Sequence, residues 1–86
     1  MGLHKKFEDN LNVISKNMKE IRTDKEISLS KLSDKLMLMG IDISKQSLHR
    51  IEKNQRSVRD YEVSGIALAL GVKTDDLLNN FINSIK

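Results

Sequence analysis

The sequence predicts one all-α domain, and three observations support this prediction. The 86 residues contain no proline, apolar residues recur mostly at steps of three and four, and capping residues and glycines divide the chain into five segments. The apolar share of 38% is enough for one small core but too little for a deep catalytic pocket. We therefore expect a compact five-helix arrangement that forms a single domain over residues 1–86.

The first expected helix ends near Arg22. A stripe at steps of four, four, three, four and three is formed by Leu3, Phe7, Leu11, Ile14, Met18 and Ile21. Such spacing keeps apolar side chains on one side of a helix. The second helix is expected to begin after Ser28, a residue type favoured at N-caps, and to end before Gly40. The side chains expected to face inward from it are Leu29, Leu32, Leu36 and Met39.

The other three helices are also marked by their end residues. Ser44 is the expected N-cap of the third helix, which stops near Asn54, a residue type that tolerates left-handed backbone. Asp60 is the expected cap of the fourth helix, and Gly71 ends it. Thr74 is the expected cap of the fifth. The apolar residues of these last two helices are Val63, Ile66, Ala67 and Leu70, then Leu77, Leu78, Phe81, Ile82 and Ile85.

The second and third helices form a helix-turn-helix candidate. Their connector is longer than the usual tight turn, so either the second helix continues through residues 37–39 or the turn is an enlarged loop. We favour the longer helix, because methionine and leucine are good helix formers.

The third helix has two chemically different faces. At 100° per residue, an arc of about 140° contains the side chains of Lys45, Gln46, His49, Arg50 and Lys53. Leu48 and Ile51 fall on the opposite side. A helix that grips a core on one face and exposes long polar groups on the other is suited to the major groove of DNA.

Positive charge is concentrated in the same region. Residues 44–59 contain five cations and one anion, a net charge of +4, whereas the whole chain carries +3. The excess would therefore attract a polyanion at one place. The alternative is a solvated charged face with no partner, as most charge runs are.

Several other classes of site are not indicated. The absence of cysteine excludes disulfides and thiolate metal sites, and the two histidines, His4 and His49, have no clustered carboxylates beside them. No glycine-rich phosphate loop or nucleophile–base pattern is present, so we expect neither an enzyme nor a cofactor. No stretch has the length of a membrane span, and we expect a cytoplasmic protein without a membrane contact.

Four motifs occur in an informative order. They are Asn17–Arg22 (NMKEIR), Leu32–Leu36 (LSDKL), Ile43–Glu52 (ISKQSLHRIE) and Ile66–Val72 (IALALGV), followed by Leu77 and Leu78. In combination they resemble the lambda-repressor-like helix-turn-helix family, also described as Cro/cI or XRE-type. The resemblance covers about residues 14–78, which leaves 79–86 as a candidate dimerisation extension.

The resemblance implies roles for individual residues. The base-contacting positions of the family correspond to Lys45, Gln46 and Arg50, with Lys45 able to contact either guanine or phosphate. Ser47 matches a position that binds phosphate or a neighbouring base, and Arg56 matches a basic loop position near the DNA backbone. Arg22 and Glu52 match a buried ion pair.

The sequence departs from the family pattern in three places. Leu29 replaces a glutamine that holds phosphate in many members, so Ser28, Ser30 or Lys31 would have to provide that contact. Asn54 replaces the usual glycine after the third helix. The stretch from Met37 to Asp42 is longer than the common form, which could tilt the third helix.

These features lead to the hypothesis of a sequence-specific double-stranded DNA-binding regulator that acts as a repressor. Besides the three base-contacting residues, the DNA backbone or periphery would be contacted by Ser28, Lys31, Ser47, His49, Lys53, Arg56 and Arg59. For His49 a bystander role is the alternative.

The C-terminal apolar stripe suggests a second surface. Phe81, Ile82 and Ile85 extend past the family match and would form the interface of a homodimer on a palindromic operator. The alternative is that they pack inside the molecule against Leu3 and Phe7. A different function is an adaptor or antitoxin that keeps the fold and binds a partner protein through this stripe.

Overall fold

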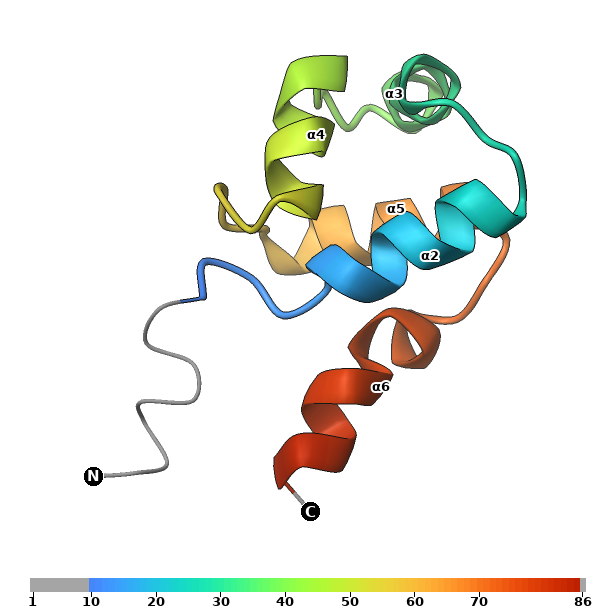
Figure 1. The fold of residues 1–86 in the computed structure, drawn as a ribbon. Helices are drawn as coiled ribbons and strands as arrows, with labels where there is room; N and C mark the ends of the chain where they lie inside the picture. Colours follow the sequence, from blue (N-terminus) through green and yellow to red (C-terminus); the bar gives the residue numbers. More distant parts are fainter. Residues whose placement is uncertain (1–9, 86) are drawn as a thin grey trace.

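The predicted five-helix, all-α fold is confirmed. The computed structural model describes residues 10–85, and within that range it contains five α-helices and no strand. The helices are α2 (Ser15–Asp24), α3 (Leu29–Leu38), α4 (Lys45–Glu52), α5 (Asp60–Leu70) and α6 (Thr74–Ile85) (Figure 1).

The helices pack around one core. Figure 1 shows α2 and α5 in the middle of the molecule, with α3 and α4 on one side and α6 on the other. Every described helix contributes to the core, whose largest fully buried side chains are Ile14, Met18, Leu32, Leu36, Ile43, Leu48, Ile51, Ile66, Leu70 and Leu77. Among the helices of residues 10–85, none covers the outer side of α4, where the side chains are exposed.

Several helix ends lie where the sequence predicted them. The Ser28 hydroxyl accepts a hydrogen bond from the Lys31 backbone N–H at 3.0 Å, which satisfies a free donor at the start of α3. Gly40 and Gly71 adopt left-handed φ values of 79° and 74° after α3 and α5, and Asn54 adopts 58° after α4. As predicted, α3 continues beyond Met37 and ends at Leu38, but six residues, 39–44, still separate it from α4, so the connector is also longer than a tight turn.

The start of the first helix was predicted wrongly. The helix begins at Ser15, and Leu11 lies before it with 53% of its surface exposed, so the stripe is not continuous. The predicted helix is interrupted at Asn12, because the Asn12 side-chain Oδ1 accepts hydrogen bonds from the backbone N–H groups of Ile14 and Ser15. Leu3 and Phe7 lie outside the described residues.

Three smaller predictions also need correction. Asp60 is the first residue within α5 and Arg59 occupies the N-cap position, while the Glu62 carboxylate accepts the Arg59 backbone N–H at 2.9 Å. Thr74 is likewise inside α6, and Asp76 Oδ2 accepts the Lys73 backbone N–H at 3.0 Å. In both helices the acid of the first turn, placed three residues beyond the cap position, supplies the acceptor. Met39 is exposed and does not face inward.

The C-terminal helix closes the bundle and extends beyond it. Leu77 is fully buried and Leu78 packs against the core. Phe81 and Ile82 are half-buried, and Ile85 is 54% exposed. In the described part of the chain, no helix is long and apolar enough to cross a membrane.

Candidate nucleic-acid interface

Helix α4 has the two faces that its sequence predicts. Leu48 and Ile51 are fully buried in the core. The opposite face consists of five exposed residues, namely Lys45, Gln46, His49, Arg50 and Lys53. Four of them, all but Lys53, line a hollow of about 350 Å³ together with Leu29 and Gln55. The hydrogen-bonding ends of Gln46 and Arg50 are therefore accessible from solvent, as base recognition requires.

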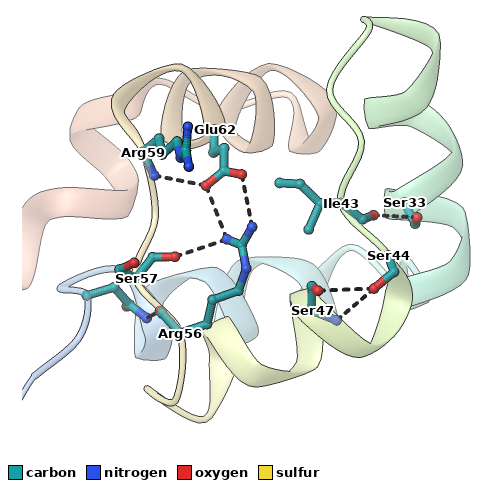
Figure 2. A network of polar contacts seen from close by, with 9 residues as sticks. Ser33, Ile43, Ser44, Ser47, Arg56, Ser57, Arg59 and Glu62 are labelled. Carbon is teal, nitrogen blue, oxygen red and sulfur yellow. Dashed lines mark hydrogen bonds and ion pairs between the residues drawn. The ribbon is translucent and has the colours of Figure 1, made fainter.

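The N-terminal end of α4 is held by serine hydroxyls (Figure 2). The Ser44 hydroxyl caps the helix by accepting the Ser47 backbone N–H at 3.1 Å, and the two hydroxyls also lie 3.1 Å apart. Just before the cap, the Ser33 hydroxyl of α3 donates to the Ile43 carbonyl at 2.7 Å. These contacts fix the start of α4 relative to α3.

The C-terminal end of α4 is held by two asparagines. Asn12, only 7% exposed, donates through Nδ2 to the Ile51 carbonyl at 3.0 Å and to the Arg56 carbonyl at 2.9 Å. Asn54 Oδ1 accepts the backbone N–H groups of Leu11 and Asn12 at 2.9 and 3.1 Å, and its Nδ2 donates to Asn10. The segment before α2 is thereby bonded to the end of α4 and to the loop that follows it.

Arg22 of α2 and Glu52 of α4, which were expected to pair, lie in bidentate contact. Arg22 Nε donates to Glu52 Oε2 at 2.7 Å, and Nη2 donates to Oε1 at 3.0 Å. The remaining nitrogen, Nη1, donates to the Ile27 carbonyl at 2.8 Å. The pair connects α4, α2 and the α2–α3 turn, and it neutralises a carboxylate beside the basic face.

Arg56 has a role inside the domain that the sequence did not predict. Its guanidinium binds the nearly buried Glu62 carboxylate through two contacts of 3.1 Å, and Nη1 also donates to the Ser57 carbonyl (Figure 2). Burial alone would raise the pKa of Glu62. The hydrogen bonds from Arg56 and from the Arg59 backbone, with the charges of both arginines, nevertheless lower that pKa below its usual value. The pair fixes the loop between α4 and α5.

The remaining predicted contact residues lie at the surface. Ser28, Lys31 and Arg59 are exposed, although the Ser28 hydroxyl already caps α3. Leu29 is half-buried, packs against the core and also reaches the hollow beside Lys45. Among the described residues, no group of three histidine, cysteine or acidic side chains is arranged to hold a metal ion.

The contacts of Asn12 and the Arg56–Glu62 pair were not predicted from the sequence. An asparagine is a common N-cap residue, so Asn12 carried a signal, but the apolar stripe through Leu11 and Ile14 favoured an uninterrupted helix. Arg56 and Glu62 are six residues apart across a loop, and no helical period relates them. Nothing in the sequence pattern indicates that they meet.

Comparison with known proteins is consistent with this geometry. Residues 18–77, more than half of the chain, match the model of a helix-turn-helix family. The chain belongs to the XRE-type, lambda-repressor-like helix-turn-helix family. Neither curated proteins nor solved structures yielded a match.

Membership of this family identifies a DNA-binding transcription regulator. The two helices of the predicted helix-turn-helix, α3 and α4, both lie within the matched residues. Regulators of this family are generally not enzymes.

Proposed function

We propose that this helix-turn-helix protein is a sequence-specific repressor that reads the major groove of double-stranded DNA with α4. The observation that carries the proposal is the exposed basic face of a helix whose other face is anchored by Leu48 and Ile51. The core, the serine caps and the Arg22–Glu52 pair hold this helix from several directions. Such support gives a rigid reading surface, and repression would follow from steric exclusion at the bound site.

The exposed residues divide between recognition and affinity. Arg50 is suited to bidentate bonds with guanine, and Gln46 to bidentate bonds with adenine. Lys45 would contact guanine or phosphate. Phosphate contacts from Lys31, Lys53 and Arg59 would provide affinity and register without reading sequence. Arg56 is paired with Glu62 and is therefore not expected to contact phosphate.

Selection of bound duplexes from a random pool tests the proposal, because it returns the preferred sequence and the spacing of half-sites. We expect Arg50→Ala to reduce discrimination at one base pair by about 5- to 150-fold, the value of one bidentate contact. Lys31→Ala should lower the affinity for selected and random duplexes by the same factor. Equal losses on both kinds of duplex for Arg50→Ala would refute the assignment of α4 as the reading element.

We also propose that the protein binds a palindromic operator as a homodimer. The support is the apolar C-terminal part of α6, where Ile85 is 54% exposed beside the half-buried Phe81 and Ile82. Two-fold symmetry would place two recognition helices about 34 Å apart on successive major-groove turns. Sedimentation of the wild type should show a dimer, and Ile85→Asp should shift it toward the monomer. A wild type that remains monomeric at high concentration contradicts this interface.

The same apolar surface supports the second candidate function, an adaptor or antitoxin that binds a different protein. Gel shifts with selected and random duplexes separate the two functions. A repressor will retain a preference for its selected duplex as salt is raised, whereas an adaptor will show only weak binding that salt abolishes for every sequence.

A further inference from the structure

A second hollow lies between α2 and the recognition helix. It has a volume of about 240 Å³ and is lined by Lys19, Arg22, His49, Glu52 and Lys53. Lys19 belongs to α2, and α2 contributes no residue to the proposed base-reading face, which lies on α4. Four of the five lining side chains are basic, so the hollow is suited to an anion.

The one carboxylate in this hollow is already neutralised. Both oxygens of Glu52 accept hydrogen bonds from Arg22, and the third Arg22 nitrogen is bonded to the Ile27 carbonyl. Lys19 and Lys53 are exposed, and among the described residues neither ammonium has an ion-pair partner. Glu20, the acid next to Lys19 in the chain, lines a different hollow between α2 and α6. The positive charges of Lys19 and Lys53 are therefore available to bind an anion from another molecule.

The hollow adjoins the proposed reading surface. His49 lines both this hollow and the one that contains Lys45, Gln46 and Arg50. A duplex held against α4 would therefore bring its backbone past the gap between α4 and α2. Lysine binds phosphate as a compact point charge that needs no fixed bonding geometry.

We propose that Lys19, His49 and Lys53 form a phosphate-binding notch, in which α2 and α4 together grip the DNA backbone beside the recognition helix. The proposal rests on the DNA-reading role of α4 and adds α2, through Lys19, to the binding surface. Arg22 supports the notch by neutralising Glu52 and does not itself contact phosphate.

The salt dependence of binding reports the total number of phosphate contacts, so the difference in slope between a variant and the wild type isolates the contact that the variant removes. We would measure the affinity of the full chain for its selected duplex and for a random duplex over a series of salt concentrations, by fluorescence anisotropy. Lys19→Gln should reduce the slope of log K against log salt by about 0.9, the value for one phosphate contact on B-DNA. It should also lower the affinity for both duplexes by the same factor, while Lys19→Arg should restore the slope to that of the wild type.

Lys73→Gln is the matched control. Lys73 is exposed and directly precedes α6, the helix that lies on the opposite side of α2 and α5 from α4 (Figure 1), so the same charge change there should leave the slope unaltered. Unaltered thermal unfolding of Lys19→Gln would show that any loss arises at the DNA. Equal slopes for Lys19→Gln and Lys73→Gln, with a wild type that binds its duplex, would overturn the notch alone. A wild type that selects no duplex would overturn the proposed function and the notch with it.

Discussion

Asn12 offers the sharpest test of how α4 is held in place. Its side chain makes four hydrogen bonds of 2.8–3.0 Å, two as acceptor from the start of α2 and two as donor to the end of α4 and the following loop. Each bond contributes about 0.5–1.5 kcal/mol net, so Asn12→Ala should lower the free energy of unfolding by about 2–6 kcal/mol. That is a large share of the ~5–15 kcal/mol that stabilises a small domain.

Urea denaturation measures this loss, and two further variants identify its cause. Asn12→Asp keeps the acceptor for α2 but places a carboxylate oxygen against the Ile51 and Arg56 carbonyls, so we expect it to be less stable than the wild type. Asn79→Ala, an exposed asparagine on α6, should change stability by less than about 0.5 kcal/mol. If Asn12→Ala lost no more than Asn79→Ala, the bonds to α4 would not hold the domain together. Wild-type stability for Asn12→Asp would restrict the role of Asn12 to capping α2.

Two further predictions concern the loop after α4 and the turn after α3. Because the pKa of Glu62 is lowered in the folded state, its stabilising effect is present above its ordinary value of about 4.5 and is lost as pH falls through the folded value. The difference in unfolding free energy between the wild type and Glu62→Gln should therefore shrink as the pH falls below about 4.5, and parallel pH profiles would contradict the Arg56–Glu62 pair. Gly40→Ala should cost about 1–2 kcal/mol in urea denaturation, because an added Cβ meets no neighbour within 4 Å but the φ of 79° is strained for alanine. Gly40→Asn should cost less, and equal losses would mean that backbone conformation is not the cause.

Local signals in the sequence were sufficient for most of the fold. Serine caps at Ser28 and Ser44 and left-handed residues at Gly40 and Asn54 act within one helical turn, so they can be recognised without knowledge of the tertiary structure. The amphipathic pattern of α4 likewise predicted which residues are buried and which are exposed.

Long-range contacts could not be predicted in this way. Asn12 bonds to carbonyls about forty positions further along the chain, and this bonding competes with the helical pattern that Leu11 and Ile14 suggest. Arg56 also matched a DNA-contacting position by sequence, whereas its partner in the structure is Glu62 across a loop. The hollow between α2 and α4 could not be predicted for the same reason, because Lys19 and Lys53 come together only when the two helices pack.

The most direct test of DNA reading by α4 is an NMR structure of the protein bound to its selected duplex. We expect intermolecular NOEs from the Gln46 and Arg50 side chains to base protons in the major groove, with the backbone fold of α2 to α5 unchanged. NOEs to the duplex that arise from α6, with none from α4, would contradict the assignment of α4 as the recognition helix.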